Sequence, residues 1–348
     1  MVNIYKFLHR YRIIKYLKGN RVIKKKVISV MLVLTLVMGF FTACKKDDDG
    51  LKKVKLCEVA HSIFYAPQYV AIEKGYFKEE GIKIKLVNGA GADKVMTSVL
   101  SGDSDIGFMG SEASIYVYQQ GEKDYIVNFA GLTQRAGNFL VARDDKAFKW
   151  EDLKGKTVLG GREGGMPEMI FEYILKKKGI DPEKDLTIVK NIDFGLTAGA
   201  FSSGQGDYTV EFEPFATGLE KEKDGYVIAS LGEESGYVPY TAYSAKKSYI
   251  EDNKDTIRAF TKAIQKGLDY VNTHSSEEIA KVIKPQFKET SMDDLVTIID
   301  RYKQQDTWKT TTEFTKDSFE LLQDILWESK VLEDRVPYED LVNTEFSK

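Results

Sequence analysis

Residues 52–87 read KKVKLCEVAHSIFYAPQYVAIEKGYFKEEGIKIKLV, and this stretch indicates the fold class. Its first nine residues alternate between polar and apolar side chains, as a half-buried strand does. Residues 67–80 carry apolar side chains at helical spacing, and Gly81 marks the end of the helix. Residues 82–87 alternate again, which predicts a second strand. A strand, a helix and a second strand in this order predict an α/β fold with a mainly parallel sheet.

The alternation of strands and helices continues, and we expect two lobes, each with a mainly parallel sheet flanked by helices. In the first lobe, further elements are predicted over 93–100, 106–109, 112–120, 125–132 and 138–142. In the second lobe, strands are predicted over 157–159, 186–190, 208–212 and 226–229, helices over 167–178 and 214–222, and a glycine-rich segment over 195–206.

The remainder of the chain is predicted to be helical and to return to the first lobe. Residues 247–346 show helical patterns, and such helices can bury their apolar faces only on lobes that have already formed. The boundaries that we predict are 53–142 for the first part of lobe one, 143–240 for lobe two and 241–348 for the return to lobe one. Strands should cross between the lobes near 141–144 and 240–244.

Residues 1–43 have the parts of a secretion signal: a run of lysines, an apolar segment over 27–41 and small residues directly before Cys44. The apolar segment is shorter than the roughly 20 residues that span a bilayer. The ending Phe-Thr-Ala-Cys resembles a bacterial lipobox, in which the cysteine is lipidated. We therefore expect a lipoprotein with a tether over 44–52, anchored on the extracytoplasmic face of the bacterial membrane. The alternative is a plain signal anchor with a chance cysteine.

Composition limits the partners of the protein. Residues 1–43 contain nine Lys and Arg and no Asp or Glu, so the chain from Cys44 onward carries a net charge of about −12. Nucleic acid is therefore not expected as a partner, because phosphate binding needs a basic face. Cys57 is expected in the core. His61 and His274 are the only histidines after residue 43, so neither a metal site nor a cofactor is expected.

Three stretches resemble one family of binding proteins. Residues 62–82, SIFYAPQYVAIEKGYFKEEGI, resemble the opening of periplasmic-type substrate-binding proteins of the SsuA, NrtA and ThiY group, which handle sulfonates, nitrate and thiamine-pyrimidine precursors. Residues 100–107 and 206–216 are similar to two later motifs of that group. The resemblance implies a type II-like periplasmic-binding-protein fold that closes on a solute and hands it to the permease and ATPase of an ABC importer.

Candidate ligand contacts in the first lobe follow its predicted strands, because ligands of open α/β sheets bind beyond the carboxyl ends of the strands. Phe64 and Tyr65 could stack on a planar solute and Ser62 could donate a hydrogen bond, or one of the rings could belong to the core. Gly110 and Ser111 open a helix whose N–H groups could bind a polar ligand edge. Ser111 could equally act as a helix cap.

Candidate contacts in the second lobe begin with the glycine-rich segment 160–166. Gly161 and Gly164 would let the backbone approach a ligand closely at the start of a helix. Arg162 could bind an acidic group, or it could be a solvated residue of a turn.

Two carboxylates and two tyrosines complete the candidates of the second lobe. Glu211 and Glu213 share one face of a predicted strand. We expect Glu211 to accept hydrogen bonds from an amine or aminopyrimidine and Glu213 to be tied to its own lobe. Tyr237 or Tyr240 could line the pocket or pack against the hinge.

The sequence therefore predicts a solute-binding protein without catalytic activity. Its ligand would be a planar heterocycle such as a thiamine-pyrimidine precursor, or a sulfonate-type anion. The alternative is an enzyme related to thiamine-pyrimidine synthesis, although the yeast relative depends on a cysteine-rich motif that this chain lacks. The carboxylates at 211 and 213 leave a hydrolase open. A ligand-sensing module is a further alternative.

Overall fold

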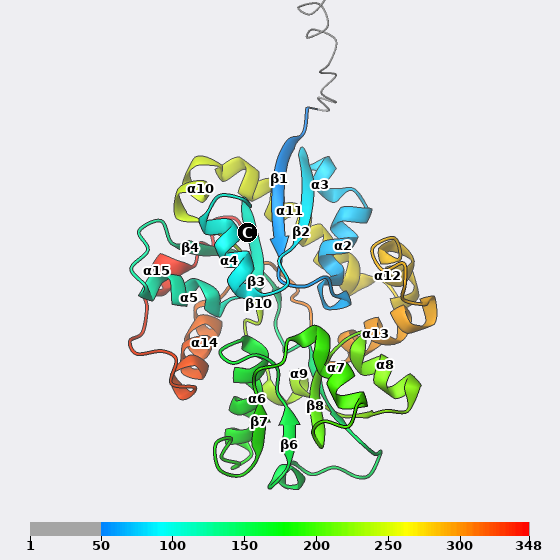
Figure 1. Ribbon diagram of the computed structural model, residues 1–348. Coiled ribbons are helices and arrows are strands. Elements are labelled where there is room, and N and C mark those ends of the chain that lie inside the picture. The colour runs from blue at the N-terminus through cyan, green and yellow to red at the C-terminus, as the bar shows by residue number, and fades with distance from the viewer. Residues whose placement is uncertain (1–49, 348) are drawn as a thin grey trace, which may run out of the picture. The chain divides into compact units, whose positions relative to one another are not determined.

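The computed structural model describes residues 50–347 (Figure 1). The predicted signal peptide, Cys44 and most of the predicted tether lie outside the described residues. Between residues 50 and 347, no helix is both long and apolar enough to cross a membrane. This part of the chain forms two five-stranded sheets, each flanked by helices.

The first sheet has the strand order β2-β1-β3-β10-β4. Strands β1, β2 and β3 are parallel to one another, and β10 is antiparallel to both β3 and β4. Four strands therefore run one way and β10 runs the other way. The bounds are β1 Lys52–Glu58, β2 Ile82–Asn88, β3 Ile106–Gly110, β4 Ile126–Thr133 and β10 Thr241–Lys246.

The second sheet repeats this plan with the order β7-β6-β8-β5-β9. Here β5 is antiparallel to its neighbours β8 and β9, while β6 is parallel to β7 and β8. Each sheet is thus mixed but mainly parallel, and its reversed strand is the one that arrives from the other sheet. The bounds are β5 Asn138–Ala142, β6 Thr157–Leu159, β7 Thr187–Val189, β8 Tyr208–Phe212 and β9 Tyr226–Ser230.

Helices cover both sheets. Those within the two sheet-forming regions are α2 Ala66–Glu73, α3 Tyr76–Glu79, α4 Ala92–Leu100, α5 Glu112–Gln119, α6 Met166–Lys177, α7 Phe194–Ser202, α8 Phe215–Glu222 and α9 Leu231–Ser235. Two short 3₁₀ helices, η1 Ile63–Tyr65 and η2 Trp150–Leu153, precede α2 and β6.

The C-terminal helices pack mainly on the first lobe. They are α10 Lys247–Asp252, α11 Lys254–Thr273, α12 Ser276–Ile283, α13 Met292–Gln304, α14 Lys316–Glu328 and α15 Tyr338–Leu341. Helix α11 packs against α2 and α3, and α15 packs against β4. Helix α14 packs against α6 instead, and Lys176 Nζ donates a hydrogen bond to the carbonyl of Glu328 at 2.6 Å. The tail therefore also contacts the second lobe.

The first crossing between the sheets lies earlier in the chain than the expected 141–144. Strand β4 belongs to the first sheet and β5 to the second, so the chain crosses at residues 134–137. The crossing passes so close to Phe64 that a Cβ on Gly137 would lie 2.5 Å from that ring. The second crossing runs through α9 and residues 236–240 into β10, next to the expected 240–244.

Two other predicted segments differ from the structure. The glycine-rich segment expected at 195–206 forms helix α7 through Ser202, with Thr197 and Phe201 buried. The single helix expected over 67–80 is divided into α2 and α3 at Gly75, which has a φ of 77°.

Candidate functional site

The topology brings the carboxyl ends of the parallel strands of both sheets together. Strand β4 ends and β10 begins at the edge where β3 ends, because Thr241 pairs with both Gly110 and Thr133. Strand β5 begins where β8 ends, because Asn138 pairs with Phe212. Both crossings therefore join carboxyl edge to carboxyl edge, which is where open α/β sheets bind ligands.

We call the region between these edges the interlobe seam. It comprises residues 59–65 and 110–112 of the first lobe, 160–166 and 212–214 of the second, and the crossing segments 134–138 and 236–240. Side-chain contacts across the seam include two hydrogen bonds: Ser62 Oγ donates to the carbonyl of Glu213 at 3.3 Å, and Tyr116 Oη of α5 donates to the carbonyl of Gly164 at 3.2 Å.

The candidates after β1 pack inside the seam. Phe64 is fully buried, and its ring contacts those of Tyr65, Phe212, Tyr240 and Tyr302 at centroid distances of 5.2–6.1 Å. Tyr65 is also buried and packs edge-on against Phe108. Ser62 Oγ accepts a hydrogen bond from the N–H of Phe64 and so caps η1.

His61 is held by two hydrogen-bonding contacts and a stacked ring. Its Nδ1 lies 2.8 Å from Glu58 Oε1, its Nε2 lies 3.0 Å from the carbonyl of Gln286, and its ring stacks on Phe287. The hydrogen bond to the Glu58 carboxylate raises the pKa of His61, whereas burial opposes the rise. Gln68 and Tyr69 also donate to the Glu58 carboxylate.

The turn after β3 places a buried carboxyl group in the seam. Ser111 Oγ donates to the carbonyl of Pro239 and accepts no hydrogen bond from a helix N–H, so it ties α5 to the second crossing. The next residue, Glu112, is 3% exposed. Its carboxyl group folds back over Gly110, where a Cβ would lie 2.1 Å from Glu112 Oε2. Position 110 therefore needs glycine for this placement of the carboxyl group.

Glu112 is held between the two lobes without a cationic partner. Burial raises the pKa of its carboxyl group to about 8, although backbone N–H groups of Glu112 itself and of Met166 oppose the shift. Met166 begins α6 of the second lobe. The Oε2 atom of Glu112 is buried and has no hydrogen-bond partner.

The glycine-rich loop of the second lobe contacts the first lobe at several points. Gly161 and Gly164 have φ values of 95° and 73°. The N–H of Gly164 donates to Glu168 Oε2 at 3.2 Å, which holds the loop on α6. Arg162 lies 3.2 Å from Asp93 of α4, and both side chains are about half exposed. The loop is therefore in contact with α4 and α5 of the first lobe.

The two carboxylates of β8 have different surroundings. Glu211 is buried and accepts hydrogen bonds from Thr209 Oγ1 at 2.6 Å and Thr197 Oγ1 at 3.0 Å. Burial raises the pKa of Glu211 to about 7, and the two hydroxyl groups oppose this rise.

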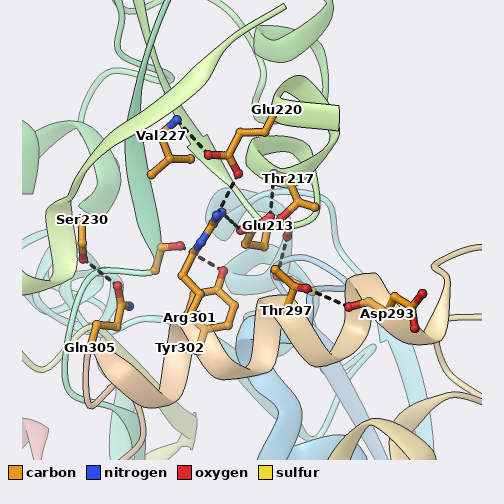
Figure 2. A network of polar contacts seen from close by, with 12 residues as sticks. Glu213, Thr217, Glu220, Val227, Ser230, Asp293, Thr297, Arg301, Tyr302 and Gln305 are labelled. Atoms are coloured by element: carbon orange, nitrogen blue, oxygen red, sulfur yellow. Dashed lines mark hydrogen bonds and ion pairs between the residues drawn. The ribbon is translucent and has the colours of Figure 1, made fainter. Parts of the chain in front are cut away.

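Glu213 is part of a network with α13 and α8 (Figure 2). It accepts hydrogen bonds from the N–H and the hydroxyl of Thr217, both at 3.0 Å, and it pairs with Arg301, which also pairs with Glu220 at 2.8 Å. Burial raises the pKa of Glu213, and the Arg301 charge opposes the rise. Glu213 is therefore bonded both to Thr217 of its own lobe and to Arg301 of α13, so it links that lobe to α13.

The structure separates the two tyrosines of the second crossing. Tyr237 is 57% exposed, donates to Asp306 Oδ2 at 2.6 Å and lies under the guanidinium of Arg135. Tyr240 is buried against Phe64, and its hydroxyl group has no hydrogen-bond partner. Tyr240 is thus the one that faces the seam, and Tyr237 lies on the surface of the crossing.

Four side chains in the seam have buried polar atoms without hydrogen-bond partners: Glu112, Arg135, Asn138 and Tyr240. Both polar atoms of the Asn138 amide are without a partner, and the residue is fully buried. Buried polar groups are normally hydrogen-bonded, so a buried polar group without a partner needs a physical explanation. A ligand between the lobes would supply the missing partners.

Sequence reasoning did not select Glu112 or Asn138 as ligand contacts. Glu112 resembles an ordinary acidic residue in the first turn of a helix. Asn138 was the first residue of a predicted strand and carried no motif. The sequence did contain one feature that could have indicated Asn138 as a ligand contact: it is an Asn at the start of an otherwise apolar strand, directly after Ala136-Gly137.

The described residues contain no group of three or more His, Cys, Asp or Glu placed to hold a metal ion. An acidic groove of about 440 Å³ lies between α8 and α13, lined by Thr217, Glu220, Lys221, Ser291, Asp293, Asp294 and Thr297.

Cys57 is buried as predicted, and burial raises the pKa of its thiol.

A family model described as NMT1/THI5 like matches residues 63–278. The chain belongs to this family. "Putative binding protein YtlA" of Bacillus subtilis (strain 168) is 49% identical over 315 residues, which are 90% of this chain and 94% of that protein. The formylaminopyrimidine-binding protein of Halalkalibacterium halodurans is 23% identical and covers 75% of this chain and 79% of its own length.

Enzymes also occur among the relatives. The 4-amino-5-hydroxymethyl-2-methylpyrimidine phosphate synthase of Aspergillus parasiticus is 25% identical over 60% of this chain and 63% of its own length. Among solved structures, the alkanesulfonate-binding protein SsuA from Xanthomonas axonopodis pv. citri, bound to MOPS, superposes with a TM-score of 0.68 at 14% identity. It covers 84% of this chain and 98% of that one. The predicted periplasmic-binding-protein fold is confirmed, and the similarity to binding proteins supports a solute-binding role.

Proposed function

We propose that this protein is the lipid-anchored solute-binding component of an ABC importer and that it captures a small organic nutrient in the interlobe seam. The observation that carries the proposal is the set of buried polar groups without partners at Glu112, Asn138 and Tyr240. Leaving such groups unpaired costs about 1–3 kcal/mol each, and a ligand that pairs with them recovers this free energy.

Capture would work by closure of the two lobes. Glu112 comes from the first lobe, whereas Asn138 begins a strand of the second sheet and Tyr240 lies on the second crossing. A ligand that touches all three interacts with both lobes only when they are closed, so its binding favours the closed state. Phe64 and Tyr65 form the buried aromatic floor of the same region.

The proposed ligand class is a planar heterocycle such as a thiamine-pyrimidine precursor, with a sulfonate-type anion as the other candidate. Mass spectrometry of small molecules released from the purified, denatured protein tests this. Recovery of a stoichiometric small organic molecule supports the proposal. Purified protein that releases no small molecule, and that no compound of either class stabilises in a thermal-shift screen, would contradict it.

The lipid anchor is a separate part of the proposal and rests on Cys44 and the apolar segment before it. Labelling of cells with a palmitate analogue should mark the wild-type protein and leave Cys44→Ser unmarked. Equal labelling of both would remove the anchor from the proposal.

A synthase activity is the second candidate, because relatives with that name match 60% of the chain. We expect any bound solute to be recovered unchanged after prolonged incubation. Steady formation of a product from the released solute, at more than one equivalent per protein, would favour the synthase.

A further inference from the structure

The charge of the ligand is a property on which the seam gives direct information. The two candidate ligand classes differ in charge, since a sulfonate is an anion and most amino-substituted heterocycles are uncharged at neutral pH. A side chain that distinguishes a neutral ligand from an anionic one has to be buried in the seam, without a cationic partner, and close to groups of both lobes. Glu112 meets these conditions.

The carboxyl group of Glu112 is enclosed by groups that do not neutralise a negative charge. Tyr65 of η1, Tyr116 of α5 and Tyr240 of the second crossing are near enough for Glu112 to raise the pKa of each of them. From α6, the backbone N–H of Met166 faces the carboxyl group. The acidic Glu168 of the same helix is engaged by Lys190, at 2.6 Å.

The guanidinium groups around the seam have partners, except that the buried Nε of Arg135 has none. Arg162 pairs with Asp93 and is 44% exposed. Arg301 pairs with Glu213 and Glu220. Arg135 donates to the carbonyl of Gly232 and lies 4.2 Å from the ring centroid of Tyr237, which is on the outer surface. No Arg or Lys charge contributes to the pKa shift of Glu112, so an oxyanion beside Glu112 would be buried next to a carboxyl group without one of these cations to balance its charge.

We propose, on the basis of the function proposed above, that Glu112 selects the charge of the ligand: it enters the closed seam as a neutral carboxylic acid, so the site accepts uncharged hydrogen-bonding solutes and excludes oxyanions. A protonated carboxyl group offers one O–H donor and retains acceptor oxygens. With the Asn138 amide and the Tyr240 hydroxyl group, it provides both donors and acceptors to a neutral polar edge. Gly110 is required beneath it, because a Cβ there would displace the carboxyl group.

The proposal predicts that closure takes up a proton. In an open seam, Glu112 is solvated and titrates near the ordinary value for Glu, about 4.3. In the closed seam its pKa is about 8. Between these two values closure requires protonation, so ligand affinity should fall as the pH rises, by up to about tenfold per pH unit. Above about pH 8 the affinity should level off.

The first experiment needs no ligand. Glutamate carboxyl groups labelled with ¹³C are titrated by NMR in the full-length protein, and the signal missing in Glu112→Gln identifies Glu112. We expect that signal to titrate well above pH 6. A titration near the ordinary value in a protein that scattering shows to be closed would overturn the proposal. Glu251→Gln, which removes a carboxyl group from an exposed position in α10 outside the seam, should leave the signal in place.

The second experiment uses two probes with opposite predictions, formylaminopyrimidine and MOPS, in calorimetric titrations from pH 5.5 to 9. We expect any binding to be confined to the neutral probe, with a pH slope that is present in wild type and Glu251→Gln and lost in Glu112→Gln. Binding of MOPS to the wild type, especially if Arg135→Ala abolishes it, would overturn the proposal.

The two proposals can fail separately. If neither probe binds, the solute released from the purified protein decides the charge question. An anionic solute would overturn the role of Glu112 while leaving solute binding intact. Absence of any bound solute would contradict the proposed function, and the NMR titration would still show whether Glu112 is neutral.

Discussion

At the scale of single residues, an unpartnered hydroxyl group and a partnered one can be compared in the same aromatic cluster. The Tyr240 hydroxyl group has no partner, whereas the Tyr302 hydroxyl group donates to the carbonyl of Gly137 at 3.0 Å. Both rings pack against Phe64. The pair therefore compares a buried hydroxyl group that has no partner in the protein with one that stabilises the fold.

Tyr240→Phe should leave the free energy of unfolding of the unliganded protein unchanged or slightly higher, because it removes a buried group that makes no hydrogen bond. The same variant should weaken ligand binding about fivefold, corresponding to roughly 1 kcal/mol for the lost hydrogen bond. Tyr302→Phe is the control and should lower the free energy of unfolding by about 1 kcal/mol. Urea denaturation and calorimetry measure both quantities. Equal destabilisation by the two variants would mean that the Tyr240 hydroxyl group has a partner within the protein.

The Arg301 network provides a second test at this scale. Arg301→Ala would leave the buried Glu213 without its cation, and breaking a buried ion pair in this way typically costs about 3–5 kcal/mol. Lys221→Ala is the matched control, because Lys221 pairs with Asp294 at 2.8 Å on the exposed surface of the same two helices. Such surface pairs contribute less than about 1 kcal/mol. If urea denaturation shows similar losses in the free energy of unfolding for the two variants, Glu213 does not depend on Arg301 as its partner.

At the scale of elements, helix α7 shows how weak propensity is overridden by packing. Its sequence FGLTAGAFS contains two glycines, which are unfavourable in helix interiors. The helix nevertheless forms, because it buries Phe201 and brings Thr197 to the Glu211 carboxylate. The glycines therefore reduce the stability of α7 without preventing it.

Gly199→Ala should raise the free energy of unfolding by about 0.4–1 kcal/mol, since the position is helical and a Cβ there meets no atom within 4 Å. Gly204→Ala is the control. It also has open space around it, but its φ of 97° is unfavourable for alanine, so this variant should be destabilising. Stabilisation by both variants would contradict the backbone conformation at the end of α7.

At the scale of the whole molecule, the contacts across the seam predict that ligand binding and stability are linked. Ligand present at 100 times its dissociation constant should stabilise folding by about 2.7 kcal/mol. Small-angle scattering should show compaction when the released solute is added to ligand-free protein. Asp93→Ala should hardly change either result, because the Asp93–Arg162 pair is exposed. A ligand that raises stability without any compaction would indicate binding outside the seam.

The sequence alone determined the class of the fold, because periodicity is local. Alternating residues at 52–60 and 82–87 and the helical spacing between them appear in the structure as β1, β2, α2 and α3. The motif in residues 62–82 led to the family, and the family model covers all of it except the first residue. The sequence shows a glycine at position 137 in the first crossing. The reason for a glycine there is the close approach of the Phe64 ring, and Phe64 is 73 residues away in the chain.

Only the tertiary structure decided which polar residues lack partners. Glu112 begins a helix as many acidic residues do, and nothing local shows that its carboxyl group lies over Gly110 and faces Met166. In the same way, Glu213 and Arg301 are 88 residues apart, yet they form one ion pair. The physical reason is that desolvation and hydrogen bonding depend on every group within a few ångströms, and these groups come together only when both sheets have formed and their carboxyl edges meet.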